Sequence, residues 1–432
     1  MSTARRAAHA IRMEVERGRR LDRAFGVRAA SLDARDRAFA HDLTYGTTRL
    51  RGRLDHLLAR HVERELTALD PAVLEVLRLG SYEVLYMDSV PTFAAVSEAV
   101  DQVRAVVGAK PTGLVNAVLR RVAEAGDDQA HFPDRSREPL AYLEAWGSHP
   151  SWLLERWLRR WPFEDVEALV AANNRRPPTF LLALDLGADA VLERLADAGL
   201  AGTVVADEPV HVRLDEGTRP LDALAAVPAS LIQDPAAGLV TRYADLPSGT
   251  VIADLCAAPG GKALAVSARV ARVVAVDRSP ARIRMVRENS ERTGRPVTCV
   301  VADALRPPFS GLDVALLDVP CSGTGTFARH PDARWRLDAA AIERLSMLQA
   351  RMLESVSESV APGGVLVYST CTLEPEENRD RIDSFLGTHD DFRIESTGAV
   401  PAEMVDERGC LFVTPQTNGF DGAFAARMRR TG

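Results

Sequence analysis

The sequence has few cysteines and no long apolar run, and each of these absences excludes a class of protein. Its five cysteines are odd in number, widely spaced and include no Cys-x-x-Cys pair, which argues against a disulfide framework and against a structural zinc site. No run of about eighteen apolar residues occurs, and the basic N-terminus lacks the apolar segment of a secretory signal. We therefore expect a cytoplasmic protein with no membrane span and no metal.

Lysine is absent from the first 60 residues, whereas arginine is abundant there. This segment has 14 Arg and 7 acidic residues, a net charge of +7, so the rest of the chain must carry −14 to reach the total of −7. A basic N-terminal part can offer a phosphate-binding face even on an acidic protein. Solvated, Arg-rich helix faces explain the same pattern equally well. Charge alone therefore leaves both interpretations open.

The length of 432 residues is too great for one compact core and favours two or three domains. Residues 1–133 have apolar side chains at helical spacing, with a helix start at Asp70-Pro71, and predict an all-α bundle. A polar stretch over 126–139 has the composition of a linker. Residues 148–228 predict a small α+β linker module. Its expected elements are an aromatic helix over 152–161, a strand over 179–184, a helix over 189–198 and a strand over 203–205.

Residues 229–432 alternate between strand and helix patterns, which predicts a doubly wound, Rossmann-like parallel α/β sheet. Strands are expected at 251–255, 273–276, 297–301, 314–317 and 365–368, and the clearest helices at 280–293 and 339–360. In such sheets ligands bind at the carboxyl ends of the strands. The segments directly after these strands are therefore the candidate site.

The first of these segments, DLCAAPGGK at 254–262, has the character of a cofactor loop. Its paired glycines let a ligand approach the backbone, and the following helix offers unpaired N–H groups. The spacing is not GxxxxGK[ST], which disfavours a triphosphate. Asp277 ends the second strand, where it is suited to a ribose or, alternatively, to capping a helix. Asp303 follows the third strand and is suited to an adenine amino group or, equally, to a cap.

Two cysteines, Cys321 and Cys371, follow two further strands. A lone cysteine is most often structural, but two of them at strand ends on the ligand side of one sheet favour chemistry. A thiolate that adds to C6 of a pyrimidine makes C5 nucleophilic enough to take a methyl group, and a carboxyl such as Asp318 is suited to contact N3. A target base in structured RNA must first be unstacked. By spacing and surroundings alone the two thiols are near-equal candidates, although a helix start at 375–378 would stabilise a thiolate at Cys371.

At this point the motifs resemble those of the RNA cytosine-C5 methyltransferases of the Nol1/Nop2/Sun family. The matching segments in the sheet domain are DLCAAPGGK (254–262), Asp277, Asp303, DVPCSGTG (318–325), RHPD (329–332), YSTCTLEPEEN (368–378) and FDGAFAARM (420–428). The N-terminal part resembles NusB-type RNA-binding domains through RAFAHDLTYGTTRLRGRLD (37–55), VPTFAAVSEAVDQVR (90–104) and GLVNAVLRR (113–121). The segments between them that also fit are SHPSWLLERW (148–157), ANNRRPP (172–178) and SLIQDPAAGLV (230–240). The combination is similar to the bacterial Sun-type enzymes that act on 16S rRNA.

The resemblance implies a cofactor, a partner and roles for particular residues. The cofactor is S-adenosylmethionine, and the residues implied to bind it are Cys256, Ala257, Ala258, Pro259, Gly260, Gly261, Lys262, Asp277, Asp303 and Asp318. Cys371 is implied to be the nucleophile and Cys321 to assist release of the product, with Asp318 as base or N3 contact. The implied partner is RNA, either 16S rRNA or a small-subunit assembly intermediate, and the enzyme is expected to be a monomer.

Three departures from the family pattern are visible. Val319 stands where Ala is common, Ala263 replaces a frequent Thr, and Leu-Ala-Leu-Asp at 182–185 replaces Leu-Arg-Val-Asn. The last change affects the target position more than the reaction type. Two alternatives stay open: a tRNA cytosine-C5 methyltransferase with the same catalytic domain, and a non-catalytic RNA-binding assembly factor. The NusB-like part disfavours the first. The second is disfavoured because both cysteines and four carboxylates are retained, namely Asp254, Asp277, Asp303 and Asp318.

Overall fold

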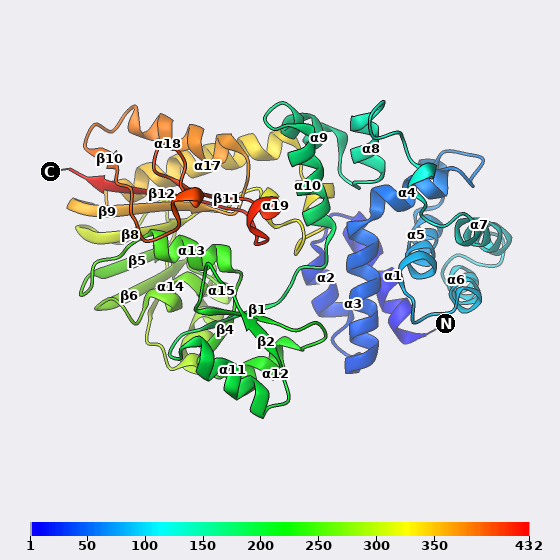
Figure 1. Cartoon of the computed structure of the whole chain (residues 1–432), viewed down its shortest axis with the longest axis horizontal. Helices are drawn as coiled ribbons and strands as arrows, with labels where there is room; N and C mark the ends of the chain where they lie inside the picture. Colours follow the sequence, from blue (N-terminus) through cyan, green and yellow to red (C-terminus); the bar gives the residue numbers. More distant parts are fainter. Residues whose placement is uncertain (1, 432) are drawn as a thin grey trace. The chain divides into compact units, whose positions relative to one another are not determined.

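The computed structural model describes residues 2–431, which separate into two compact units (Figure 1). The helical unit comprises the chain up to Arg176 together with residues 327–336. The sheet unit comprises residues 177–326 and the chain from Leu337 onward. The sheet unit thus contains the predicted Rossmann-like sheet and residues 177–228 of the predicted small module, whereas residues 148–176, with the predicted aromatic helix, belong to the helical unit. The three-part division at 1–133, 148–228 and 229–432 stays a prediction.

The helical unit is built from helices throughout, as its apolar spacing predicts. Asp70 caps α5 through a hydrogen bond that its side chain accepts from the Ala72 N–H (2.8 Å), and Pro71 occupies the first helical position. The elements are α1 (Thr3–Glu16), α2 (Leu21–Arg28), α3 (Ala34–Arg49), α4 (Arg51–Ala59), η1 (Leu66–Ala68), α5 (Pro71–Tyr86), α6 (Thr92–Val106), α7 (Thr112–Ala125), η2 (Gln129–His131), α8 (Pro139–Ala145), α9 (Ser151–Leu158), α10 (Phe163–Asn174) and α16 (Ala333–Arg336).

One apolar core joins α5, α6 and α7 in this unit. Val76, Val103 and Leu119, one from each helix, are fully buried in the same cluster. Burying side chains of this size stabilises a fold by roughly 1.5–3 kcal/mol each. The all-α prediction for this part is confirmed. None of the helices in residues 2–431 combines the length and the apolar character that a membrane span needs.

The sheet unit begins with a small antiparallel sheet in the order β2-β3-β1-β4. Its apolar residues pack against α11 and α12, for example Leu181 against Val191. The elements are β1 (Phe180–Ala183), α11 (Ala188–Asp197), β2 (Gly202–Val204), β3 (His211–Leu214), α12 (Pro220–Ala226) and β4 (Ser230–Ile232). The two predicted strands and the helix between them are present, whereas β3, α12 and β4 were not predicted.

The large sheet has eight strands in residues 2–431, in the order β10-β12-β9-β8-β5-β6-β7, with β11 paired to β12. Its elements are α13 (Pro235–Tyr243), β5 (Val251–Leu255), α14 (Gly261–Val266), β6 (Arg272–Asp277), α15 (Pro280–Thr293), β7 (Thr298–Val301), β8 (Leu312–Asp318), η3 (Thr324–Thr326), α17 (Ala339–Ser357), β9 (Val360–Thr370), η4 (Pro375–Glu377), α18 (Arg379–Leu386), β10 (Phe392–Ile394), η5 (Ala402–Met404), β11 (Leu411–Val413), α19 (Pro415–Asn418) and β12 (Ala423–Arg430).

The five strands predicted from the sequence are parallel, as expected, but the sheet also has antiparallel strands at one edge that were not predicted. Strands β9, β8, β5, β6 and β7 run parallel, but β12 lies antiparallel to β9, β10 and β11. These C-terminal strands lack intervening long helices, so no crossover requires them to be parallel. The helix predicted over 339–360 also ends early, because Val360 already pairs with Leu312 in β9. The sheet is therefore mixed, and its five central strands follow the Rossmann-like pattern.

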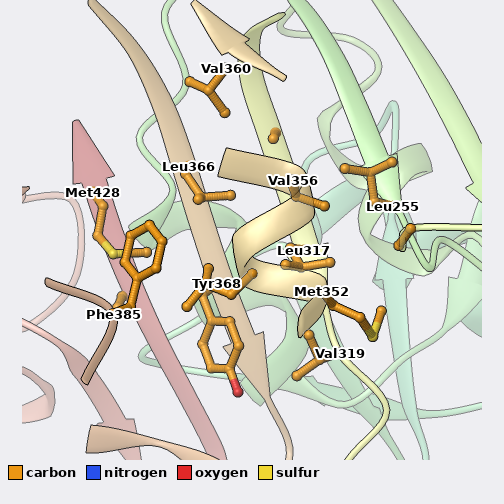
Figure 2. Close-up of a cluster of buried hydrophobic side chains, with 14 of the residues drawn as sticks. Leu255, Leu317, Val319, Met352, Val356, Val360, Leu366, Tyr368, Phe385 and Met428 are labelled. Atoms are coloured by element: carbon orange, nitrogen blue, oxygen red, sulfur yellow. The ribbon is translucent and has the colours of Figure 1, made fainter. Parts of the chain in front are cut away.

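Helices cover both faces of the large sheet. On one face, α17 and α18 pack against the central strands, with Leu317, Val356, Leu366 and Phe385 in one buried cluster (Figure 2). On the other face, α14 and α15 pack against β5 and β6. Buried on both sides, these strands have the near-continuous apolar sequence typical of a parallel sheet. The polar residues at their carboxyl ends are thereby presented along one edge.

Candidate active site

Four carboxyl groups lie at the ends of four adjacent parallel strands. Asp318 ends β8, Asp254 lies near the end of β5, Asp277 ends β6, and Asp303 follows β7. Because the order of these strands is β8-β5-β6-β7, the sheet brings the four groups into one row. Parallel pairing places such strand ends at the same edge. The structure thus assembles carboxylates that the sequence spreads over 65 residues, from 254 to 318.

The loop at 256–261 has a tightly constrained backbone. The N–H groups of Cys256 and Ala257 both donate to the carbonyl of Val276 (2.9 and 2.8 Å). Cys256 has a φ of 113°, a conformation that residues other than glycine rarely adopt. From α15, Arg282 donates to the carbonyl of Ala258 (2.7 Å) and Asn289 to that of Pro259 (3.1 Å).

Two glycines of this loop are closely packed against neighbouring side chains. Gly260 has a φ of 104°, and a Cβ added there would lie 3.1 Å from Val286. A Cβ on Gly261 would lie 2.5 Å from the Nε2 of Gln233, a clash. Close packing by neighbouring side chains therefore favours glycine at both positions, and the expected approach of a ligand to this backbone stays a prediction.

Asp254 is a buried carboxyl with an unusual charge environment. It is 1% exposed, and no side chain among residues 2–431 donates to either of its oxygens. Burial, and then the nearby Asp318 carboxylate, raise the pKa of Asp254 to about 7, although Lys262 acts in the opposite direction. A carboxyl held in this way is a typical feature of a ligand-binding site.

Lys262 and Asp318 form an ion pair beside Asp254. The Lys262 Nζ lies 2.7 Å from Asp318 Oδ2, and Ser369 donates its hydroxyl to Asp318 Oδ1 (2.8 Å). Burial lowers the pKa of Lys262, but the Asp318 carboxylate outweighs it and the net shift is upward. The side chain of Asp318 is 34% exposed, so it remains accessible to a ligand.

Asp277 and Asp303 both accept local backbone hydrogen bonds. Asp277 Oδ1 accepts from the Ser279 N–H (2.9 Å), and Arg282 lies 3.5 Å from its Oδ2. The N-cap of α15 is Ser279 itself, so the alternative in which Asp277 caps that helix is wrong. Asp303 is exposed and accepts from the Leu305 N–H (3.0 Å) in a turn. Asp277 is thus held at the end of β6 by contacts with the start of α15, whereas Asp303 is exposed to solvent.

The two candidate thiols lie together. Their Sγ atoms are 3.3 Å apart, and the Cys371 N–H donates to the Cys321 Sγ (3.4 Å). The reason lies in the sheet register, because β8 and β9 are neighbours in which Asp318 is paired with Ser369. The hydrogen bond with Cys371, together with burial, raises the pKa of Cys321 well above its usual range.

The other cysteines of the sheet unit have different surroundings. Burial, with the Asp318 and Asp254 carboxylates, raises the pKa of Cys256 to about 12, so this thiol stays protonated. Burial likewise raises the pKa of Cys410 to about 12. Within residues 2–431, no group of His, Cys, Asp and Glu is arranged to hold a metal ion. The pair of Cys321 and Cys371 is the candidate for thiol chemistry because these two thiols lie in contact at the ends of neighbouring strands.

Close backbone contacts fix the Cys321 loop against Cys371. The Gly325 N–H donates to the carbonyl of Cys371 (3.1 Å), and the Gly422 N–H donates to the carbonyl of Gly325 (2.7 Å). A Cβ on Gly325 would lie 2.6 Å from the Cα of Gly422. Only glycine fits at both positions, which explains the glycines of the segments at 318–325 and 420–428.

Residues 327–336, which come after the Cys321 loop in sequence, belong to the helical unit. Arg334 is fully buried there and donates to the carbonyl groups of Ser148 (3.2 Å) and Asn173 (3.0 Å) and to Asn174 Oδ1 (2.7 Å). Trp335 donates its indole N–H to the carbonyl of Thr48 (2.8 Å). The RHPD segment (329–332) is thus part of the helical unit, although its sequence lies within that of the sheet.

Several residues of the site were not singled out from the sequence. Gln233 lies beside Gly261, Gln349 donates to the Cys321 loop, and Ser369 donates to Asp318. Glu377 and Asn378 lie within the segment at 368–378, where the sequence pattern indicated only a helix start. The first element after Cys371 is η4, a short 3-10 helix, and α18 begins only at Arg379. The close packing of Gln233 against Gly261 could have identified Gln233 only once the fold was known.

Three family models match successive parts of the chain. Residues 244–429 match the 16S rRNA methyltransferase RsmB/F model, residues 2–124 match the NusB family, and residues 149–219 match the ferredoxin-like domain of RsmF/B-like methyltransferases. The chain also shares its fold with the crystal structure of PH0851, with a TM-score of 0.80 and 23% identity over 100% of this chain and 99% of the other. A methyltransferase homologue from Pyrococcus horikoshii matches 66% of this chain and 96% of its own, with 24% identity and a TM-score of 0.56.

The matched family models and the curated relatives identify the chain as a methyltransferase. Curated relatives that match nearly the whole length of this chain identify a more specific family within the methyltransferases. The ribosomal RNA small subunit methyltransferase B of Klebsiella pneumoniae is 33% identical over 98% of this chain and 96% of its own. That of Escherichia coli is 34% identical over 91% of both chains. The chain belongs to the ribosomal RNA small subunit methyltransferase B family, which confirms the expected enzyme class.

Proposed function

We propose that this enzyme methylates C5 of a cytosine in small-subunit rRNA through a covalent bond between a cysteine and C6 of the base. The observation that supports this most is the pair of thiols, Cys321 and Cys371, 3.3 Å apart at the edge of a methyltransferase sheet. A methyltransferase that acts on an amine or a hydroxyl needs no thiol, whereas C5 of a pyrimidine needs a nucleophile at C6. Two thiols at one place fit a reaction in which a covalent adduct is both made and broken.

The residues at the strand ends fit S-adenosylmethionine, which supplies the methyl group when bound. Glycines at 260 and 261 let a ligand approach the backbone, and the N–H groups at the start of α14 follow directly. The buried Asp254 and the ion pair of Lys262 with Asp318 provide charges that suit the polar end of such a ligand. Cys256 to Lys262, Asp277 and Asp303 complete the proposed cofactor site, with Asp277 directed to the ribose.

The two thiols have different tasks in the proposed reaction. The Cys371 sulfur forms a bond to C6, and the electron pair of the C5=C6 bond becomes available at C5 for the incoming methyl group. A base then removes the C5 proton, the C5=C6 bond re-forms and the bond from C6 to Cys371 breaks. We assign the assistance of this release to Cys321, which lies beside Cys371. Asp318, being partly exposed, is assigned the contact to N3 or the role of base.

RNA is the proposed partner, and the helical unit has features that support it. A pocket of about 480 Å³ in this unit is lined by Arg51, Arg336, Glu16 and Trp335, among others. Arg12 also lines it, but that side chain is buried and paired with Glu75. The guanidinium of Arg51 lies 5.3 Å from the centre of the Trp335 ring. Arginine and an aromatic ring together suit phosphates and unstacked bases. The relatives named as acting on the ribosomal small subunit point to rRNA, which would place the enzyme in the cytoplasm where ribosomes assemble.

The test is methyl transfer with purified protein, labelled S-adenosylmethionine and unmethylated 16S rRNA. We expect label in 5-methylcytosine after nuclease digestion. A tRNA pool and assembly intermediates of the small subunit serve as parallel substrates, and label in tRNA alone would favour the tRNA alternative. Label in a product other than 5-methylcytosine would contradict the proposed chemistry. Absence of label in every RNA would support the non-catalytic alternative.

A further inference from the structure

The two peptide groups that flank Cys321 are both tied to buried side chains. From α17, Gln349 donates its Nε2 to the carbonyl of Pro320 (2.9 Å). On the other side of the cysteine, the Ser322 N–H donates to Glu377 Oε1 (2.9 Å). Gln349 Nε2 also donates to the same Glu377 oxygen (2.8 Å), so the two contacts form one unit. The backbone can then shift little on either side of Cys321.

The segment that contains Cys371 is held in the same manner by Asn378, the residue that follows Glu377 in the chain. The Thr370 hydroxyl donates to Asn378 Oδ1 (2.5 Å), and Asn378 Nδ2 donates to the carbonyl of Thr372 (2.8 Å). One amide thus contacts the residue before Cys371 and the residue after it. The neighbours in sequence, Glu377 and Asn378, therefore contact different thiol loops.

These contacts are buried and connected. Glu377 and Gln349 are fully buried, and Asn378 is 3% exposed. The Glu377 carboxylate also accepts from the Ser322 hydroxyl. The backbone carbonyl of Glu377 accepts from the hydroxyl of Tyr368, whose ring lies in the core of the sheet unit (Figure 2). Connected buried hydrogen bonds of this type restrict local geometry.

We propose that Glu377 and Asn378 are positioning residues, which hold the release thiol Cys321 and the nucleophile Cys371 at contact distance from one another. Glu377 acts on Cys321 through the Ser322 N–H, and Asn378 acts on Cys371 through Thr370 and Thr372. The different chemical roles of the thiols rest on the proposed function, whereas the positioning itself does not. A displacement of about 1 Å at a reacting atom can reduce a rate about a hundredfold.

The first experiment measures the thiol distance without RNA or cofactor. The full-length protein is treated with diamide, which accepts two electrons as the two thiols form a disulfide, and the Cys321–Cys371 linkage is followed by mass spectrometry. Glu377→Ala and Asn378→Ala should each slow this reaction about tenfold or more. Asp380→Asn is the matched control, since Asp380 is exposed on the same segment, and it should react like the wild type. Unchanged rates in both variants would overturn the proposal.

The second experiment separates the two residues by the fate of the RNA adduct. Glu377→Ala should accumulate a covalent protein–RNA adduct on a denaturing gel, because release is impaired. Asn378→Ala should form the adduct about tenfold more slowly without accumulating it. A merely structural role predicts the same loss for both, and that result would overturn the division. Glu377→Gln retains an acceptor for the Ser322 N–H and should give a milder accumulation, which keeps the test valid if Glu377→Ala does not fold.

The two experiments also distinguish this proposal from the proposed function. A wild-type protein that makes no 5-methylcytosine, but whose disulfide formation is slowed by both variants, would contradict the function and support the positioning. A wild-type protein that methylates RNA, with disulfide rates insensitive to both variants, would support the function and overturn the positioning.

Discussion

Glu75 in the helical unit and Asp254 in the sheet unit are buried to the same extent, and each is 1% exposed. Burial alone raises the pKa of both carboxyls, yet the outcomes are opposite. Arg12 and Arg78 outweigh burial and bring the pKa of Glu75 to about 2. Near Asp254 the second influence is the Asp318 carboxylate, which adds to burial and brings the pKa to about 7. The neighbours, and not the depth, decide the charge state.

The contacts explain this difference. Glu75 accepts from Arg12 Nε (2.8 Å) and from Arg78 Nη1 (2.5 Å), and Arg78 in turn pairs with Asp55 (2.7 Å). This network is complete within the protein and therefore stabilises the helical bundle. The Asp254 carboxyl lacks such side-chain donors in the described part of the chain. A complete network is characteristic of structure, and an incomplete one of a ligand site.

The largest effect on stability is expected when Glu75, the carboxylate shared by Arg12 and Arg78, is removed. Glu75→Ala leaves Arg12 and Arg78 buried without their shared carboxylate, which should cost about 3–5 kcal/mol. All five tryptophans, at 146, 152, 157, 161 and 335, belong to the helical unit. Urea unfolding followed by tryptophan fluorescence therefore reports on this unit. Glu63→Ala, an exposed position, serves as control, and an equal loss in both variants would remove the basis for the comparison.

The opposite change in stability is expected when the charge of the buried Asp254 carboxyl is removed. The pKa of Asp254 is higher in the folded state than in the unfolded state, so the charged form is penalised above pH 7 and the penalty disappears towards pH 4. Asp254→Asn should therefore stabilise the ligand-free sheet unit at pH 8 by about 1–2 kcal/mol. Hydrogen exchange of β5 amides measures this change. A variant that is less stable than the wild type at pH 8 would show that Asp254 has a structural role like that of Glu75.

The smallest effects on stability are expected from removing one hydroxyl group in each of the two regions. Thr48 accepts from Arg12 Nη1 (2.7 Å) inside the complete network, and Ser369 donates to the partly exposed Asp318 (2.8 Å). Thr48→Val should cost about 1–2 kcal/mol, because the buried N–H loses its partner. Ser369→Ala should cost less than about 0.5 kcal/mol, since water can solvate Asp318. Fluorescence and hydrogen exchange, respectively, measure the two changes, and a reversed order would contradict the distinction.

The sequence was most informative where one local pattern decides the structure. The strand at 251–255 and the helix at 280–293 have the predicted bounds, because a short apolar run and a Ser279-Pro280 start are local features. Strands β10 and β11 were not predicted, since each has three residues and forms only by pairing with β12. Pairing between segments that are distant in sequence leaves no periodic pattern of residues from which it could be predicted.

The site shows the same limit. The residues at strand ends, such as Asp277 and Cys371, could be predicted because their position comes directly from the strand pattern. Gln349 could not, because it lies in the middle of α17 and reaches the Cys321 loop only through the fold. The assignment of residues 327–336 to the helical unit was equally hidden, since the segment belongs by sequence to the sheet domain. The cofactor and thiol roles stay predictions.

The central claim is that Cys371 forms the bond to the base and Cys321 assists its release. The most direct measurement is mass spectrometry of the covalent adduct trapped with 16S rRNA and S-adenosylmethionine in Cys321→Ala, with Cys371→Ala as its counterpart. We predict an accumulated adduct in Cys321→Ala, linked through the peptide that contains Cys371, and no adduct or turnover in Cys371→Ala. An adduct that forms in Cys371→Ala through Cys321, and is missing in Cys321→Ala, would contradict this claim.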